Sequence, residues 1–125
     1  MTTTPSGLVW NVRGLNDRAR RCVIRDLLLL HRPSFVCFQE TKLAQICNAT
    51  ALEMLGPNFD YDFVPSVGVA GGILLAWCTS AWSVLSVVKG RFSISARVQR
   101  LGSEADCWWL TGVYGPRLKK RKLSS

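Results

Sequence analysis

Three polar side chains stand where apolar segments of the sequence end, and together they could carry chemistry. Asn11 lies near the end of one apolar segment, Glu40 directly follows a second, and Tyr114 ends a third, far along the chain. In open α/β sheets, ligands gather outside the carboxyl ends of the strands. A carboxylate in such a place can hold Mg2+, because this hard cation takes oxygen ligands and keeps several waters. Each residue taken singly is more often an ordinary turn or surface residue, so the prediction depends on the three coming together.

The first third of the chain predicts the elements that must position two of these residues. Segment 7–12 (GLVWNV) has the composition of an apolar strand. A helix follows, because the side-chain oxygen of Asn16 or Asp17 can cap its first turn and apolar residues then recur at helical spacing. Pro33 ends that helix, and the apolar run 34–39 is typical of a strand buried on both faces. Strand, helix and strand within about thirty residues predict a right-handed βαβ unit.

The rest of the sequence predicts one more helix and then a series of strands. The helix spans 45–55 and ends at Gly56 and Pro57. Short segments of strand character, separated by turn residues, follow at 59–64, 72–78, 81–88, 92–99 and 106–114. The expected pattern is therefore βαβα followed by a β-meander, in a mixed α/β fold.

The charge of the chain points to a polyanionic partner. Sixteen Lys and Arg against eight Asp and Glu give a net charge of +8. Such an excess favours nucleic acid ahead of an anionic membrane, although many basic proteins bind nothing in particular. Because no apolar run reaches the roughly 18 residues of a membrane span, and the first residues lack the features of a signal peptide, we expect a nuclear or cytoplasmic protein that is not secreted and has no membrane partner.

The cysteines argue against a metal-bound or cross-linked scaffold. Their number is odd, no C-x-x-C pair occurs, and the single histidine, His31, does not complete the usual kind of zinc site. We therefore expect free, mostly buried thiols in a reducing compartment. They are Cys22, Cys37, Cys47, Cys78 and Cys107.

Four short blocks, in this order, carry a resemblance to a known family. They are WNVRGLN at 10–16, QETK at 39–42, GGILLAW at 71–77 and VYGP at 113–116. The chain resembles the N-terminal half of the endonuclease/exonuclease/phosphatase family, and within it most closely the endonuclease domain of plant non-LTR (LINE-type) retrotransposons. The resemblance implies the N-terminal half of a four-layer α/β sandwich, truncated to one mixed β-sheet with two helices. It covers nearly all of a partial domain at 1–116, which leaves 117–125 as a basic tail.

The resemblance also implies roles for individual residues. Glu40 matches the glutamate that binds the catalytic Mg2+, and Asn11 matches an asparagine that organises the metal site and contacts phosphate. Tyr114 matches a catalytic tyrosine that reaches the scissile phosphate, and Lys42 matches a lysine beside the metal. Arg13 and the arginines of the first helix are candidates for contacts with the DNA backbone, but a solvated helix face is the favoured interpretation.

Part of the family's site has no match here. The family hydrolyses phosphodiesters with a base machinery in its second half, in an Asp-x-Asn motif and a late Asp-His pair. No residue after Pro116 is Asp or His, and His31 matches no catalytic position. General acid–base help is worth roughly 10²–10⁴-fold, and each preorganised electrostatic group a further ~10²–10³. We therefore expect a truncated Mg-dependent DNA endonuclease that is inactive as this chain.

Two alternatives remain open. The first is a non-catalytic basic module that binds nucleic acid, and the second, less favoured, is a phosphatase relative that acts on small phosphates. With a single sheet, an inner face carrying some of Trp77, Trp82, Trp108 and Trp109 would lie open, which predicts association or aggregation. The basic run RLKKRK at 117–122 is expected to be solvated and not folded. It could serve as a nuclear-import patch, a phosphate-binding arm or merely a solubilising end.

Overall fold

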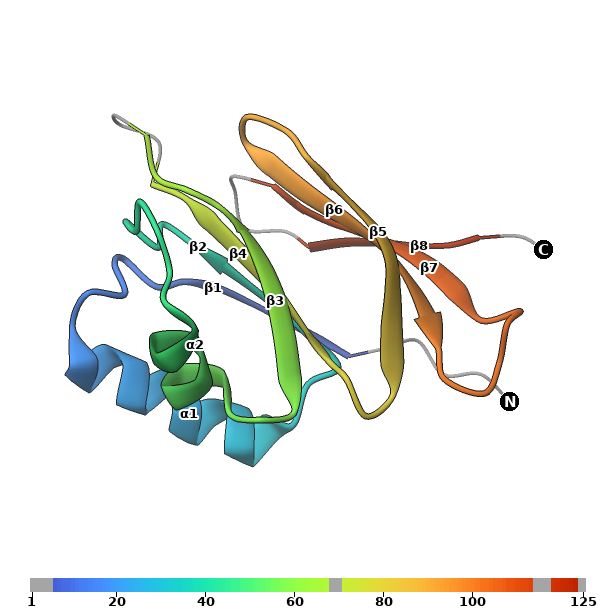
Figure 1. The fold of residues 1–125 in the computed structure, drawn as a ribbon, viewed down its shortest axis with the longest axis horizontal. Helices are drawn as coiled ribbons and strands as arrows, with labels where there is room; N and C mark the ends of the chain where they lie inside the picture. The colour runs from blue at the N-terminus through green and yellow to red at the C-terminus, as the bar shows by residue number, and fades with distance from the viewer. Residues whose placement is uncertain (1–5, 68–70, 114–117, 124–125) are drawn as a thin grey trace.

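Two β-sheets pack face to face, with both helices on the outer side of the first sheet (Figure 1). The computed structural model describes residues 6–67, 71–113 and 118–123. The first sheet has the order β1-β2-β4-β3 and the second β5-β6-β7-β8. The strands of the first sheet are β1 (Gly7–Asn11), β2 (Phe35–Gln39), β3 (Phe59–Val64) and β4 (Ile73–Cys78). Those of the second are β5 (Trp82–Lys89), β6 (Ser93–Arg100), β7 (Cys107–Val113) and β8 (Leu118–Lys122).

The predicted βαβ unit is present. Helix α1 (Arg18–His31) begins after Asp17, whose side chain accepts a hydrogen bond of 2.9 Å from the Ala19 amide. It ends at Arg32, in the left-handed conformation, directly before a proline. The helix returns the chain so that β1 and β2 pair in parallel, with Asn11 opposite Gln39. The carboxyl ends of the two strands therefore lie at the same border of the sheet.

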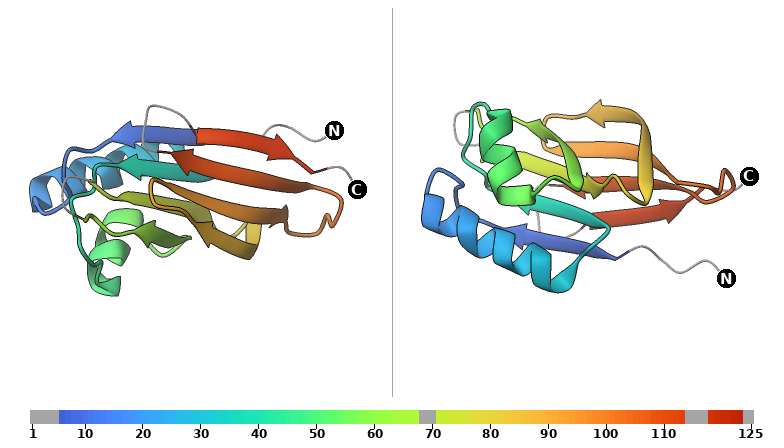
Figure 2. Two further views of the ribbon diagram at one scale, coloured as in Figure 1. Left: turned by 90° about the horizontal axis from the view of Figure 1, so that it is seen from above. Right: turned by 60° about the horizontal axis from the view of Figure 1, so that its bottom comes forward.

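The second helix is shorter than its prediction. Helix α2 (Asn48–Leu55) begins only after Cys47, whereas the expected helix began at residue 45. It packs against α1, and both helices cover one face of the first sheet (Figure 2). Neither helix in the described residues has the length and apolar character that a membrane crossing requires.

Alternate residues of β2 build two separate cores. Val36 and Phe38 face the helices, whereas Phe35 and Cys37 face the second sheet. All five residues of β2 are buried, as the continuous apolar run predicts. The inter-sheet core also contains Ile73, Leu75, Trp77, Trp82, Ile94, Ala96, Val98, Trp108 and Leu110.

The α/β class with two helices is confirmed, but the expectation of one mixed sheet is wrong. Because β4 is apolar on both faces, it needs cover on the helix side and on the opposite side. Strands β5 to β7 supply this second cover by forming a sheet of their own. Trp77, Trp82 and Trp108 are accordingly 6%, 1% and 9% exposed, so the inner face predicted to lie open is closed. Only Trp109 of the four tryptophans named above points to the outer face and is partly exposed.

The basic run near the end of the chain is also folded, in contrast to its prediction. Leu118–Lys122 form β8, which pairs antiparallel with β7 and lies end to end with β1 along one border of the molecule (Figure 2). Main-chain hydrogen bonds hold this edge strand, although four of its five residues are Lys or Arg. Lysines on an edge strand discourage further pairing. Buried Asp106 also attracts Lys122, at 3.7 Å between Nζ and Oδ1. A hydrogen bond from Arg100, ahead of other causes, lowers the pKa of Asp106 and keeps it anionic.

Candidate functional site

Asn11 and Glu40 meet at the border where β1 and β2 end. The Asn11 Nδ2 group donates a hydrogen bond to Oε2 of Glu40. The other side of the same amide is also held, because Oδ1 of Asn11 accepts a hydrogen bond of 3.2 Å from the Arg13 backbone. Two residues that are distant in sequence are thus fixed side by side, as expected from their positions at strand ends.

The loops that carry these residues have an unusual backbone. Arg13, Glu40 and Lys42 all have positive φ, at 52°, 54° and 56°. The left-handed conformation is uncommon for residues other than glycine, and such residues typically cost about 1–3 kcal/mol and cluster at functional sites. Only one other described non-glycine residue has positive φ, and it is Arg32, which caps α1. The strain is therefore concentrated on three residues that the sequence singled out as site candidates.

Backbone hydrogen bonds join the two loops beyond the ends of the strands. The donors on the first loop are the amides of Val12, Gly14 and Leu15. They reach the carbonyls of Gln39, Glu40 and Thr41 at 3.0, 2.7 and 2.9 Å, respectively. The parallel pairing of β1 and β2 is thereby extended into the loops, which holds the asparagine and the glutamate in register.

A pair of glycines at the start of β4 supports the loop from beneath. The amides of Thr41 and Lys42 donate to the carbonyls of Gly72 and Gly71, at 3.4 and 2.6 Å. Gly72 has φ of +86°, and a Cβ atom there would lie 2.5 Å from Oγ1 of Thr41 and 3.1 Å from the backbone nitrogen of Ser66. Glycine is therefore required at this position. The glycine pair was predicted as a turn and as part of the resemblance, but not in this supporting role, for which two adjacent glycines before an apolar strand were the available signal.

Gln39, the first residue of the QETK block, connects the site to the other sheet, a role that the sequence did not reveal. Gln39 is 5% exposed, and its Nε2 group donates a hydrogen bond of 2.9 Å to the Val113 carbonyl at the end of β7. This contact brings the end of the second sheet to the border where Asn11 and Glu40 lie. Tyr114, the third predicted member of the site, lies outside the described residues.

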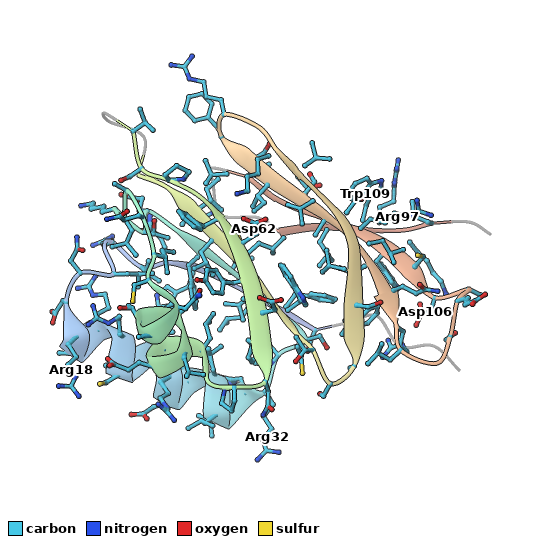
Figure 3. All side chains as sticks on the ribbon, in the orientation of Figure 1. Arg18, Arg32, Asp62, Arg97, Asp106 and Trp109 are labelled. Atoms are coloured by element: carbon cyan, nitrogen blue, oxygen red, sulfur yellow. The ribbon has the colours of Figure 1, made fainter. Side chains whose placement is uncertain are left out.

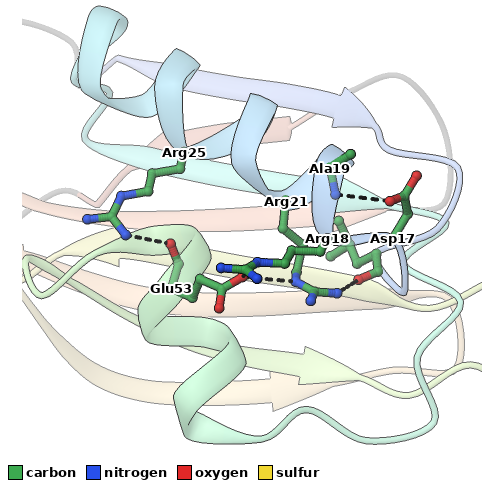
Figure 4. A network of polar contacts seen from close by, with 7 residues as sticks. Asp17, Arg18, Ala19, Arg21, Arg25 and Glu53 are labelled. Carbon is green, nitrogen blue, oxygen red and sulfur yellow. Dashed lines mark hydrogen bonds and ion pairs between the residues drawn. The ribbon is translucent and has the colours of Figure 1, made fainter.

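Arginines of α1 hold the first loop and the second helix. Nη1 of Arg20 donates to the Val12 carbonyl, and Nη1 of Arg21 donates to the Leu15 carbonyl at 2.7 Å. Arg25 donates to the Glu53 carbonyl at 3.0 Å, which ties α1 to α2 (Figure 4). Arg20 and Arg25 are exposed, as the interpretation of a solvated helix face expects, and all three arginines also stabilise the chain's own loops and helices.

Two cations adjoin the Asn11–Glu40 pair. Arg13 and Lys42 are exposed, and neither forms an ion pair with any described residue. A hollow of about 640 Å³ opens beside Asn11 and Arg13, with Trp10 and Val23 among its lining. The site thus combines one carboxylate, one carboxamide and two free cations next to open space, a combination that suits a phosphate group.

The oxygen donors of this site suit a hard divalent cation in part. Mg2+ is commonly held by one or two carboxylates and completed by waters and substrate phosphates. Glu40 supplies one carboxylate, with the amide of Asn11 fixed against it. The described residues contain no group of three or more His, Cys, Asp or Glu side chains that could enclose a metal. The residues present therefore fit one side of a magnesium site.

The two-sheet fold and the border that carries Asn11 and Glu40 together point to one class of protein. The sequence matches the Endonuclease/Exonuclease/phosphatase family over residues 8–111. The chain belongs to this family. Its members are nucleases and phosphatases that generally depend on a divalent metal.

Solved structures share this fold at low sequence identity. The human Nocturnin catalytic domain has a TM-score of 0.62 at 17% identity, and it aligns over 86% of this chain and 48% of its own. The AP endonuclease LMAP from Leishmania major has a TM-score of 0.61 at 19% identity, over 88% of this chain and 40% of its own. A humanized TDP2 from D. rerio has a TM-score of 0.61 at 18% identity, over 86% of this chain and 48% of its own. This chain thus spans less than half the length of these structures, and no curated protein matches it.

Proposed function

We propose that this chain supplies the metal- and phosphate-binding part of a Mg2+-dependent DNA endonuclease of the type found in non-LTR retrotransposons. The observation that carries the proposal is the Asn11–Glu40 pair, held in strained loops beside Arg13 and Lys42, which form no ion pair within the described part of the chain. The ordered blocks around these residues, quoted above, favour the retrotransposon type. The net charge of +8 favours a polymeric nucleic acid over a small phosphate.

Each residue has a distinct part in the proposed reaction. Glu40 would hold the cation, and a bound cation would supply charge neutralisation on the phosphate during hydrolysis, in which a P–O bond to water forms, the P–O bond to the alcohol breaks and a water proton passes to the alcohol. Asn11 orients the carboxylate through its amide and fixes its own position through the Arg13 backbone. Lys42 and Arg13 attract the phosphodiester. Tyr114 is assigned to the scissile phosphate by its motif alone.

The experiment that tests this proposal is metal binding followed by NMR. Mn2+, used as a paramagnetic substitute for Mg2+, should broaden the backbone signals of residues 11–13 and 39–42 first. Glu40→Gln should remove this selective broadening, whereas Glu104→Gln, which changes an exposed glutamate in the β6–β7 turn, should leave it intact. Broadening that persists in Glu40→Gln would refute the assignment of the metal site.

Catalysis by the 125-residue polypeptide on its own is a separate question. The resemblance places the family's general base in an Asp-x-Asn motif and a late Asp-His pair, and this sequence has no match to either. We expect plasmid nicking with Mg2+ to be indistinguishable from that of Glu40→Ala. Mg2+-dependent nicking that Glu40→Ala abolishes would contradict this expectation.

A second candidate is a basic module that binds nucleic acid without cleaving it, and the charge of the chain favours it. The two candidates differ in the effect of Glu40→Gln. Loss of the carboxylate removes metal binding in the first, whereas it leaves the function of a purely electrostatic module unchanged.

A further inference from the structure

The outer face of the second sheet carries no helix in the described residues. Both α1 and α2 lie on the far side of the first sheet (Figures 1 and 2). The strands β5 to β8 therefore present a broad face that none of the described elements covers. Its composition is unlike that of an ordinary solvated sheet face, because one large aromatic side chain lies among cations.

Three residues form a row across this face. Register pairs Arg97 of β6 with Trp109 of β7, and the same Trp109 with Arg121 of β8. Neighbouring Cα atoms in such rows lie about 5 Å apart, so the two arginines stand roughly 10 Å from each other with the indole between them. Arg97 and Arg121 are exposed and Trp109 is partly exposed. Figure 3 shows Trp109 beside Arg97 on this sheet.

The charge of these strands has a single sign. The four strands contain no Asp or Glu, but seven Lys and Arg residues: Lys89, Arg97, Arg100, Lys119, Lys120, Arg121 and Lys122. Asp106, just before β7, is buried and already engaged by Arg100 and Lys122. Arg97 and Arg121 form no ion pair with any described residue. Their charges therefore remain available to an anionic partner.

The surface is hollowed next to the tryptophan. A shallow hollow of about 410 Å³ is lined by Val88, Ser95, Trp109, Thr111 and Arg121. The hydroxyls of Ser95 and Thr111 form a hydrogen bond of 2.9 Å with each other and give this hollow a polar surface next to the indole ring of Trp109. A flat group placed in this hollow would lie against the exposed side of the indole.

We propose that the row of Arg97, Trp109 and Arg121 binds single-stranded nucleic acid, with a base stacked on Trp109 and backbone phosphates on the two arginines. Aromatic side chains in basic grooves bind single strands because every base offers a flat face for stacking. A duplex hides these faces within its own stack, so the row prefers a single strand. This binding surface is separate from the Asn11–Glu40 border and goes beyond the proposed nuclease function.

The test is fluorescence anisotropy of the 125-residue chain with a fluorescein-labelled oligothymidylate of ten nucleotides. Trp109→Ala should weaken binding about 5- to 100-fold, the usual effect of removing one stacking platform. Trp109→Phe should retain most of the affinity. Arg97→Gln with Arg121→Gln should reduce the salt slope by about 1.4, because each phosphate contact on a single strand contributes about 0.7.

Two controls separate this site from general charge and from the border site. Arg18→Gln with Arg32→Gln removes the same charge from the first residue of α1 and from its C-terminal cap, at the far side of the molecule (Figure 3), and should change affinity less than twofold. Trp109→Ala should leave the selective Mn2+ broadening at residues 11–13 and 39–42 intact, which separates this surface from the border site. Equal losses in the Arg18/Arg32 variant would overturn the proposal, and so would unchanged binding in a folded Trp109→Ala variant.

A membrane is the other anionic partner to be distinguished. Vesicles of phosphatidylcholine with phosphatidylserine should bind weakly and without dependence on Trp109. If Trp109→Ala abolishes vesicle binding but leaves oligothymidylate binding intact, the surface is a membrane site and the proposal is wrong.

Discussion

At Glu40 the backbone and the side chain have different requirements. The positive φ of 54° favours glycine, whereas the proposed metal site needs the carboxylate. A residue kept in this conformation destabilises the fold by about 1–2 kcal/mol relative to one in an ordinary conformation. The same holds for Arg13 and Lys42, so the border is a region where stability is given up for a fixed geometry.

This conflict can be measured with paired substitutions at Glu40. Glu40→Gly and Glu40→Ala both remove the carboxylate, but only glycine adopts positive φ without strain. We expect Glu40→Gly to be the more stable variant by about 1 kcal/mol in urea unfolding. At Val88, an exposed strand residue, the order should reverse, with glycine less stable than alanine by about 0.5–1 kcal/mol. If glycine were less stable than alanine at Glu40, as it is expected to be at Val88, Glu40 would not be strained.

The thiols provide a second test at this scale. Backbone amides of Thr50 and Ala49, at the N-terminal end of α2, favour the Cys47 thiolate and lower its pKa. Burial raises the pKa of Cys37 to about 12. At pH 7.5 a larger fraction of Cys47 than of an ordinary thiol is therefore ionised, and iodoacetamide should modify Cys47 first and leave Cys37 unmodified until the chain unfolds. Mass spectrometry of Cys47→Ser should lack the fast product, and its persistence in that variant would contradict this assignment.

At the scale of elements, the start of β4 decides where Glu40 stands. The carbonyl of Gly72 accepts a hydrogen bond from the Thr41 amide, and Gly72 packs against the Thr41 side chain. The segment that leads into β4 therefore holds the loop that follows β2. Residues of β1 and β2 and the two glycines directly before β4 thus fix one carboxylate. The glycine pair is as much a part of the site as the residues that face solvent.

Alanine at Gly72 tests this support. The new Cβ meets Thr41 and the Ser66 backbone at a positive φ, so we expect Gly72→Ala to lower the free energy of unfolding by at least about 2 kcal/mol. Gly102→Ala is the matched control, because its φ is +81° but nothing lies within 4 Å of the new Cβ. That variant should lose only about 1 kcal/mol. Equal losses at the two positions would mean that the close packing of Gly72 contributes nothing.

On the scale of the whole molecule, the packing of the two sheets includes a close contact between one residue of each sheet. Gly112 of β7 faces Cys37 of β2, and a Cβ on the glycine would lie 2.7 Å from the Cys37 Sγ atom. Together with the hydrogen bond between Gln39 and Val113, this contact sets the end of β7 against the border of the first sheet. The distance between the two sheets therefore also sets where the end of β7 lies relative to the border that carries Asn11 and Glu40.

A double-mutant cycle measures this approach. Gly112→Ala should cost about 1–3 kcal/mol by overpacking, and Cys37→Ala about 1 kcal/mol by leaving a small cavity. In the double variant the new methyl group occupies space that the sulfur has left, so the combined loss should fall short of the sum by at least 0.5 kcal/mol. Additive losses in urea unfolding would show that the two positions are not in contact.

The local elements of this protein follow from its sequence, because their determinants are local. Asp17 as a cap, the proline after Arg32, the buried run of β2 and the alternation along β6 predict helix and strand limits to within one or two residues, apart from the late start of α2. The parallel pairing of β1 and β2 also follows, since a short βαβ unit leaves few other arrangements. The meeting of Asn11 and Glu40 is a consequence of that pairing.

The tertiary structure decided the features that depend on contacts between distant residues. Hydrophobic burial has no direction, so the apolar faces of β4 and β6 could not reveal that they cover each other as two sheets. Edge pairing uses main-chain atoms, which explains why the basic composition of β8 gave no sign of a strand. The row of Arg97, Trp109 and Arg121 exists only through cross-strand register, because these residues lie 12 positions apart in the sequence.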